Sequence, residues 1–334
     1  MSWFFLGARV GGRDITLSPL TTSGPIFLAG GVPWRWKGVS AFPLAAMFAR
    51  GENIDPFLDA FAGFNLLRVW SYVTWPGTGW EPSDSATLLA FAEHCKTRGF
   101  YVELTLLTDD DPARIQPARD RVAFLSAHNP QNVVLEIGNE PTTHKSINTR
   151  ALQAALTSGL LISSGDYEDS NRFFGSFLTA HTPRDGEWPR KAHDLLEYHN
   201  GGGPSAPSDP AHKVPVVADE PMRPDQAGFN VQDYRAYFGT CALLGAGGTF
   251  HYEGGKFGRL PTADEARCAA AALEGLNAFP ADAPRGPYRR IDELGGSLRT
   301  YAVGNSMVRV RPLTTAAPEP GWTPIDGDGI LWKR

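Results

Sequence analysis

Two glutamates stand in similar settings in this sequence and could work together as a pair of catalytic carboxylates. Glu140 lies near the end of NVVLEIGNEP and Glu220 near the end of VPVVADEP, so each follows a run of apolar, largely β-branched residues and precedes a proline. Such runs predict buried parallel strands, and proline, which has no N–H to donate, ends them. Two carboxylates at one opening can divide proton donation and nucleophilic attack between them, as cleavage of a glycosidic bond requires.

Eight apolar runs alternate with helical patterns along the chain. The predicted strands cover residues 39–42, 66–70, 101–107, 133–138, 161–165, 177–181, 214–218 and 248–252. The segments between them mostly keep helical spacing, which completes a βαβα alternation. Eight such units predict an α/β fold, a (β/α)8 TIM barrel whose chemistry sits at the carboxyl ends of the strands. Glu140 and Glu220 end the fourth and seventh strands, a separation close to three units of about 30 residues each.

The two ends of the chain predict a small β-rich appendage beside the barrel. Residues 32–282 contain the barrel, whereas residues 1–31 hold glycine pairs and short apolar runs typical of a strand hairpin. Residues 283–334 hold further short strands around a Gly304-Asn305 hairpin signal. We expect the C-terminal segment to form the appendage, with the N-terminal hairpin as a candidate second part.

Composition narrows the class of partner. The 334 residues carry a net charge of −5 without a charge run, which argues against nucleic acid or a membrane as a partner. Cys95, Cys241 and Cys268 have unrelated spacings and predict reduced core residues. The short apolar run at the N-terminus has no basic region before it. No signal peptide is therefore expected, which favours the cytoplasm unless the chain is trimmed or exported by another route; the oligomeric state stays open.

Four segments resemble the clan A glycoside hydrolases, a retaining (β/α)8 family that includes many cellulases, mannanases and β-glycosidases. The segments are IFLAGGVPWRWKGVSAF, GFNLLRVW, IGNEP and VVADEP, in the order of the family. The resemblance implies that Glu140 is the general acid/base and Glu220 the nucleophile, acting on a β-linked oligo- or polysaccharide without a cofactor or metal. From the residues alone, Glu140 could instead lie in the first turn of a helix, and Glu220 could be a surface loop acid.

The resemblance also assigns substrate-binding residues. Arg68 would keep Glu220 ionised and Asn139 would bind a sugar 2-hydroxyl, with a structural ion pair and a helix cap as the respective alternatives. His181, at the end of the sixth strand, would face the same opening, although a structural role is its alternative. Because neighbours in a strand face opposite sides, only one of Asp219 and Glu220 can face the opening. The resemblance implies that this residue is Glu220, so Asp219 is expected to turn away.

Several aromatic residues are candidate platforms for sugar rings. Trp70 ends the second predicted strand and Trp75 and Trp80 follow it, with core packing as the alternative. Tyr252 ends the eighth strand, where the family commonly places a tryptophan, and would substitute for it. Three acids at 109–111 are followed by proline and predict a solvated loop and helix start instead of a metal site.

Together these residues predict a retaining glycoside hydrolase that works by double displacement. Two alternatives stay open from the sequence. One is a transglycosylase that uses the same carboxylates, and the other is a non-catalytic barrel that binds carbohydrate or protein.

Overall fold

The computed structural model describes most of the barrel and parts of both ends of the chain. The described residues are 16–24, 26–74, 79–81, 84–141, 159–163, 165, 175–181, 214–219, 231–243, 246–278, 289–294, 298–303, 306–310, 323–324 and 330–333. The helices predicted near 148–160 and 188–198 lie wholly or almost wholly outside these residues. Within the described part of the chain, every helix is too short or too polar to cross a bilayer.

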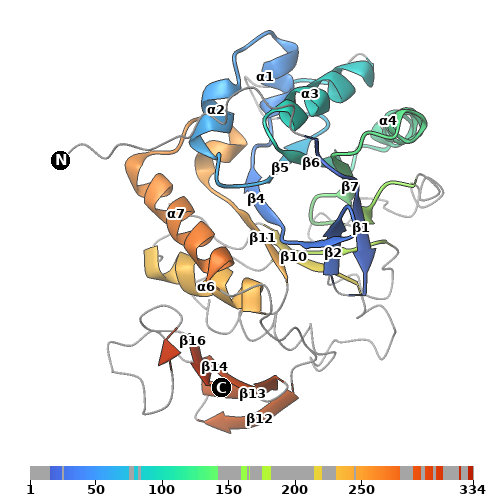
Figure 1. Ribbon diagram of the computed structural model, residues 1–334. Helices are drawn as coiled ribbons and strands as arrows, with labels where there is room; N and C mark the ends of the chain where they lie inside the picture. The colour runs from blue at the N-terminus through green and yellow to red at the C-terminus, as the bar shows by residue number, and fades with distance from the viewer. Residues whose placement is uncertain are drawn as a thin grey trace.

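Eight parallel strands form a nearly closed barrel (Figure 1). Their order around the barrel is β8-β7-β6-β5-β4-β11-β10-β9. The two edges meet where the Ser176 N–H donates to the Ile162 carbonyl at 2.7 Å. The strands are β4 (Lys37–Ser40), β5 (Leu66–Trp70), β6 (Tyr101–Leu107), β7 (Val133–Gly138), β8 (Ile162–Ser163), β9 (Leu178–His181), β10 (Val216–Asp219) and β11 (Gly247–Phe250). The predicted (β/α)8 barrel is thereby confirmed.

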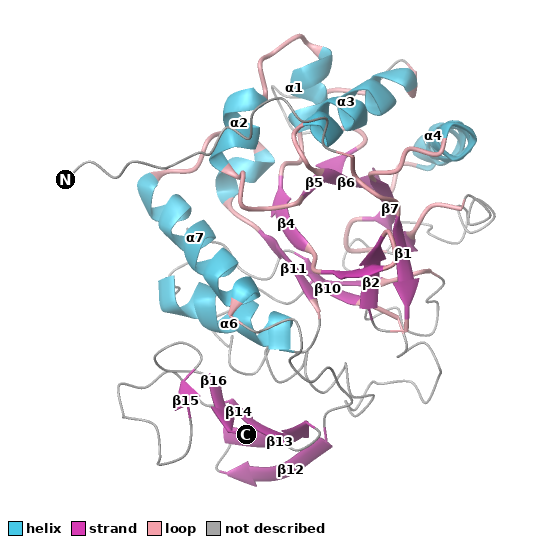
Figure 2. Ribbon diagram, in the orientation of Figure 1, coloured by secondary structure: helices cyan, strands magenta, loops and turns pink. Residues whose placement is uncertain are grey.

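Helices cover the outside of the barrel, as Figure 2 shows. They are α1 (Leu44–Ala49), α2 (Asp55–Ala60), α3 (Ala86–Thr97), α4 (Ile115–His128), α6 (Val231–Leu243) and α7 (Ala263–Asn277), with 3-10 turns η1 (Pro112–Arg114) and η5 (Glu253–Lys256). A capping box starts α7, since Thr262 Oγ1 accepts from the Glu265 N–H and Glu265 Oε2 accepts from the Thr262 N–H.

The main hydrophobic core lies between the strands and these helices. The three cysteines are free and buried there or at its edge, as the sequence predicted. Burial raises the pKa of the Cys95 and Cys241 thiols, which therefore stay protonated and unreactive in the folded chain.

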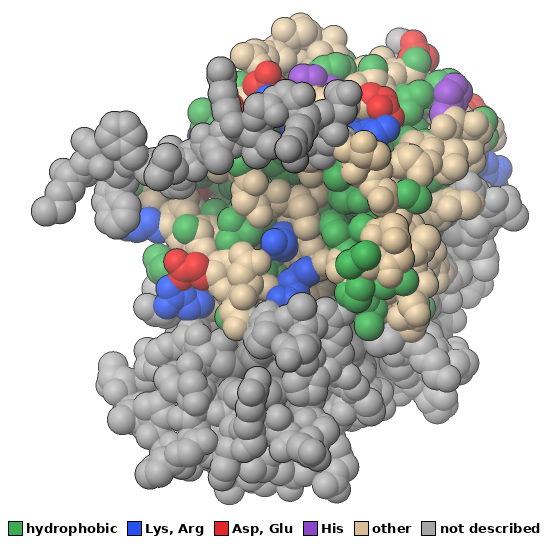
Figure 3. Space-filling view, in the orientation of Figure 1, with side chains coloured by type: hydrophobic (Ala, Val, Ile, Leu, Met, Phe, Trp, Pro, Cys, Tyr) green, Lys and Arg blue, Asp and Glu red, His purple; other side chains and the backbone are tan. Residues whose placement is uncertain are grey.

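A three-stranded antiparallel hairpin sheet closes the amino-terminal end of the barrel. It consists of β1 (Leu20–Ser23), β2 (Ile26–Ala29) and β3 (Val32–Trp34). Leu20 and Phe27 pack against side chains at the starts of the barrel strands, namely Trp36, Leu66, Tyr101, Val134, Phe177 and Val217. Hydrophobic side chains gather over the hairpin in Figure 3, with Lys and Arg side chains beside them. The hairpin leaves the opposite, carboxyl-terminal end of the strands uncovered.

The C-terminal segment forms a separate five-stranded antiparallel sheet close to α6 (Figure 1). Its strands are β12 (Arg289–Leu294), β13 (Leu298–Val303), β14 (Ser306–Val310), β15 (Thr323–Pro324) and β16 (Ile330–Lys333). The predicted C-terminal β appendage is thus present. Among the described residues its strands pair with one another, whereas the N-terminal hairpin packs on the barrel end.

Candidate active site

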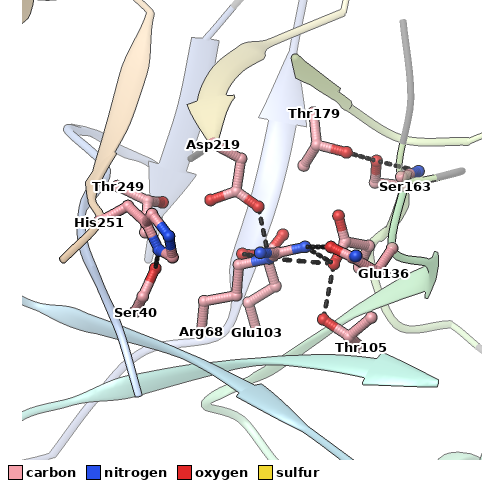
Figure 4. Close-up of polar contacts among 12 residues, drawn as sticks. Ser40, Arg68, Glu103, Thr105, Glu136, Ser163, Thr179, Asp219, Thr249 and His251 are labelled. Carbon is pink, nitrogen blue, oxygen red and sulfur yellow. Dashed lines mark hydrogen bonds and ion pairs between the residues drawn. The ribbon is translucent and has the colours of Figure 1, made fainter. Parts of the chain in front are cut away.

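Arg68 lies at the centre of a polar network inside the barrel (Figure 4). Its Nε is 2.5 Å from Asp219 Oδ2, and its Nη2 is 2.7 Å from Glu136 Oε2. The same Nη2 donates to Asn139 Oδ1 at 2.9 Å. The side chain of Glu103 approaches the guanidinium more loosely, with its Oε2 3.9 Å from Nε. One guanidinium from β5 therefore reaches side chains from β6, β7 and β10.

All four charged side chains of this network are fully buried. Buried charges are strongly destabilising unless ion pairs and hydrogen bonds compensate for the lost water. Thr105 adds such a bond, because its hydroxyl donates to Glu136 Oε2 at 2.6 Å. The network thus holds its side chains in fixed positions beneath the carboxyl ends of the strands.

Further polar pairs line the same interior level. Ser163 Oγ and Thr179 Oγ1 lie 2.8 Å apart and join β8 to β9. In the same way, His251 Nδ1, just after β11, and Ser40 Oγ, at the end of β4, lie 2.9 Å apart. These contacts tie neighbouring strands together inside the barrel, and Figure 4 shows both pairs beside the Arg68 network.

The end of β7 presents Asn139 and Glu140 as the sequence predicted for a strand end, not a helix start. Asn139 is almost fully buried, and its N–H donates to the Leu107 carbonyl at 2.8 Å. Glu140 is partly exposed and has φ +47°, in the left-handed region that non-glycine residues rarely adopt. Strained backbone of this kind clusters at active sites, where the surrounding structure maintains it.

Asp219 differs from its expected orientation. It is the last residue of β10, pairs in register with His181, and turns its carboxylate inward to Arg68. Asp219 was expected to turn away from the opening that Glu220 faces, whereas its carboxylate points to Arg68 in the barrel interior. The physical reason is the ion pair with Arg68, which compensates for burying the carboxylate. Glu220, the predicted nucleophile, lies outside the described residues.

An aromatic stack lies next to the network on the β4 and β11 side. The rings of Phe42 and Trp70 stack with centroids 4.4 Å apart, and the Phe42 ring also stacks on His251 at 5.5 Å. The Arg68 guanidinium lies 5.3 Å from the Phe42 centroid, within cation–π range. Trp70 is 5% exposed, so at most its edge reaches the opening in this structure.

The structure corrects the predicted sugar platform at Tyr252. The ring is fully buried in the outer core, where it packs against Phe61 and Phe250. Its hydroxyl donates to the Arg259 carbonyl at 2.7 Å, and burial raises its pKa. No ring face is left for a sugar, because alternation along this chain segment sends His251 inward and Tyr252 toward the helices.

The structure describes the other predicted binding residues to different extents. Trp80 is partly buried, pairs with Val73 through two backbone hydrogen bonds of 2.8 Å, and packs against the core. The backbone of His181 ends β9, next to Asp219, but its side chain lies outside what the structure describes. Trp75 is also outside the described residues.

Sequence reasoning missed the inner carboxylates Glu103 and Glu136 and the inward His251. A signal for the first two was present, because each is a charged residue in the middle of an otherwise apolar strand. In a parallel barrel such a residue can be accommodated only toward a polar interior or an ion pair.

Glu103, Glu136 and Asp219 place carboxylate oxygens within 4.8 Å of one another, a grouping that could in principle hold a cation. The guanidinium of Arg68 already contacts two of these carboxylates. A fixed positive charge thus occupies the acidic centre and repels a metal ion. The geometry favours an arginine-centred network here.

Comparisons with known proteins identify the fold. No family model and no curated protein matches the sequence. Among solved structures, the endo-1,4-β-mannanase of Rhizomucor miehei matches with 12% identity and a TM-score of 0.58, covering 78% of this chain and 100% of the mannanase. A putative glycoside hydrolase of Bacteroides vulgatus matches with 13% identity and a TM-score of 0.62, covering 95% and 71%.

A β-glucanase of Saccharophagus degradans, solved in complex with cellotetraose, matches with 15% identity and a TM-score of 0.54. The match covers 78% of this chain and 94% of the glucanase. At such identities the likeness concerns the fold. The chain has the (β/α)8 barrel fold of the clan A glycoside hydrolases, the family that its sequence motifs resemble.

Proposed function

We propose that the protein is a retaining glycoside hydrolase that cleaves a β-linked glycan, with Glu140 as general acid/base and Glu220 as nucleophile. The observation that carries the proposal is the geometry at the end of β7. There the partly exposed Glu140 has a left-handed backbone, next to Asn139, which Arg68 holds from inside the barrel. A carboxyl group is thus presented rigidly at the barrel end that the hairpin leaves open.

The reaction has two steps. Glu220 attacks the anomeric carbon and forms a glycosyl ester while the glycosidic C–O bond breaks and Glu140 donates its proton to the leaving oxygen. Glu140 then removes a proton from water, whose oxygen attacks the anomeric carbon and releases Glu220. The sugar leaves with its original anomeric configuration, because two inversions cancel.

The roles require different ionisation states of the two glutamates. Glu140 must hold a proton before bond cleavage, which its partial burial and the negative charge of Glu220 favour. Glu220 must be ionised to attack. Arg68 supplies positive charge at Asp219, the residue before Glu220, and so favours the ionised nucleophile.

The substrate class follows from the barrel's structural neighbours and from the site. The matched enzymes are named as a β-mannanase and a β-glucanase, and the latter was solved with cellotetraose. Asn139 directs its Oδ1 toward Arg68, which leaves its amide N–H groups for a sugar hydroxyl. We therefore propose a β-linked oligo- or polysaccharide of hexoses as substrate.

The test is turnover of β-mannan, β-glucan and aryl β-glycosides by the wild type, Glu140→Gln and Glu220→Gln. Loss of general acid catalysis should lower kcat roughly 10²–10⁴-fold on the polysaccharide. On a dinitrophenyl glycoside, whose leaving group needs no proton, Glu140→Gln should keep most of kcat/KM, whereas kcat should stay low because the second step still lacks its base. Glu220→Gln should be inactive on both substrates, because no ester can form.

Glu93→Gln is the matched control, since Glu93 is an exposed glutamate on α3 that pairs with Lys96. It should turn over like the wild type. Proton NMR of the first product should show the β-anomer. Initial release of the α-anomer, or near wild-type turnover by either glutamine variant, would disprove the assignment.

A further inference from the structure

We propose that Asp219 is a positioning residue which, through Arg68, sets the distance between the two proposed catalytic glutamates. The inference rests on the proposed function and deepens it. Asp219 is not expected to touch the substrate, because its side chain is fully buried against the guanidinium.

The argument begins with where Arg68 makes its contacts. Its Nη2 donates to Asn139 Oδ1 at 2.9 Å, and its Nε lies 2.5 Å from Asp219 Oδ2. Asn139 directly precedes Glu140, and Asp219 directly precedes Glu220. The same guanidinium therefore binds the residue before each proposed catalytic carboxylate, and the Cα atoms of the two residues in each pair are one peptide unit, about 3.8 Å, apart.

The strand order shows why this link matters. β7 and β10 lie on different sides of β5: β6 separates β5 from β7, whereas β4 and β11 separate it from β10. On the other side of the barrel, β8 and β9 separate β7 from β10, and these two edge strands meet at the Ser176–Ile162 hydrogen bond. Backbone hydrogen bonds thus connect the two catalytic strands only through intervening strands. Arg68 connects them directly across the barrel interior, as Figure 4 shows for Asp219 and Glu136.

The link is stiff because the guanidinium has a third anchor. Glu136 accepts from Nε at 3.1 Å and from Nη2 at 2.7 Å, and Thr105 in turn donates to the same Glu136 oxygen. A planar guanidinium presents its donors in a fixed fork, so bonds to three partners define its orientation. A shift of Asp219 or Asn139 would break one of these bonds.

The rate of double displacement depends on how closely the distance between the two carboxyl groups is maintained. Retention needs the two carboxyl groups about 5–5.5 Å apart, whereas a gap beyond about 6.5 Å suits inversion. Misplacement by about 1 Å can lower a rate by about 10²-fold. A link that holds Asp219 and Asn139 at a fixed spacing therefore keeps the carboxyl groups within the range for nucleophilic attack.

The first test is a double-mutant cycle of Asp219→Asn and Arg68→Lys. Asn keeps the shape of Asp219 but loses its charge, and Lys keeps the charge of Arg68 but cannot bind three partners in one plane. We expect each single variant to lower kcat about 10–100-fold with KM changed less than about threefold. The double variant should lose no more than Arg68→Lys alone, because both changes break the same link.

Glu265→Gln is the matched control for general destabilisation. Glu265 is also a buried carboxylate that pairs with an arginine, since its oxygens lie 2.8 and 2.9 Å from Arg259, but it lies on α7. This variant should melt at a lower temperature and keep the wild-type kcat. Additive losses in the cycle, or wild-type kcat in folded Asp219→Asn, would overturn the inference.

Crystal structures of the wild type and Asp219→Asn provide a test that needs no substrate. The separation between the carboxyl groups of Glu140 and Glu220 should increase by more than about 0.5 Å in the variant; an unchanged separation would overturn the inference. If Asp219→Asn does not fold, Asp219→Glu replaces it, because the longer side chain keeps the charge and displaces the guanidinium.

The outcomes separate this inference from the proposed function. Turnover that survives in Glu140→Gln and Glu220→Gln contradicts the proposed function. Inactive glutamine variants together with a fully active Asp219→Asn contradict only the positioning role.

Discussion

Tyr252 and His251 are adjacent residues that occupy opposite environments. The Tyr252 ring packs in the outer core and its hydroxyl donates to the Arg259 carbonyl, whereas His251 lies inside the barrel beside Ser40. Because the family pattern places an aromatic ring for sugar stacking at this strand end, the two orientations lead to different expectations for substitution.

Tyr252→Phe should therefore affect stability and not glycan binding. The change removes one buried hydroxyl and leaves the Arg259 carbonyl without that donor, which should lower the free energy of unfolding by about 1–2 kcal/mol. Urea denaturation measures this loss, and affinity electrophoresis in soluble β-glycan measures binding. Weaker glycan binding by the folded variant would show that the ring does contact sugar.

The orientation of Asp219 could not be obtained from local sequence. Its strand was predicted to cover residues 214–218 and to end at Asp219, Glu220 and Pro221. The structure extends β10 through Asp219, since Arg68, far away in the chain, supplies the compensating charge. Compensation between distant residues leaves no trace in a local pattern, whereas Glu140 after β7 was predictable from its own segment.

At the scale of elements, glycines mark where two backbones approach closely. Gly165 follows β8 with φ +93°, and a Cβ at this position would collide with the carbonyl oxygen of Gly138 at the end of β7. Gly159 also has a positive φ, +75°, but a Cβ there would meet no atom within 4 Å. Both positions therefore have a left-handed backbone, but only Gly165 lacks room for a Cβ atom.

Comparing Gly165→Ala with Gly159→Ala should separate these two effects. Gly159→Ala should lose about 1–2 kcal/mol of stability from the left-handed backbone alone. Gly165→Ala should lose clearly more, or fail to accumulate as folded protein, because β7 and the segment after β8 must move apart. Thermal melting of both variants measures the difference, and equal melting temperatures would contradict the close approach.

Element positions were predicted well where the local pattern is strong. β5, β6 and β7 match their predicted ranges. Strand β4 instead starts at Lys37, two residues before its predicted range. The prediction missed Lys37 and Gly38 because these residue types do not resemble strand residues. It was also hard to predict which side chains point into the barrel and which point toward the helices, since parallel strands buried on both sides show no clear alternation.

At the scale of the whole molecule, the hairpin packs on side chains at the starts of most of the barrel strands. Phe27 is 3% exposed and packs against Trp34, Trp36 and Phe177 with ring centroids 5.4–6.0 Å apart. Val32 lies in the same hairpin but is 66% exposed. The hairpin is therefore part of the core of the barrel on one face and solvent-exposed on the other.

Phe27→Ala should destabilise the entire barrel, whereas Val32→Ala should not. Removing the buried ring should lower the free energy of unfolding by about 3–5 kcal/mol, and truncating the exposed valine should change it by less than about 0.5 kcal/mol. Urea denaturation followed by tryptophan fluorescence measures both. A small loss in Phe27→Ala would mean that the hairpin is dispensable for the barrel.

The closed amino-terminal end also constrains the order of events in the proposed reaction. Leu20, Phe27 and their partners fill that end, and the Arg68 network fills the interior above it. A packed barrel offers no passage through its centre, so in the proposed reaction a polymer lies across the carboxyl-terminal rim. Water for the second step then reaches the glycosyl ester from the same rim that held the leaving fragment. The leaving fragment must therefore move away from the ester before water can attack it.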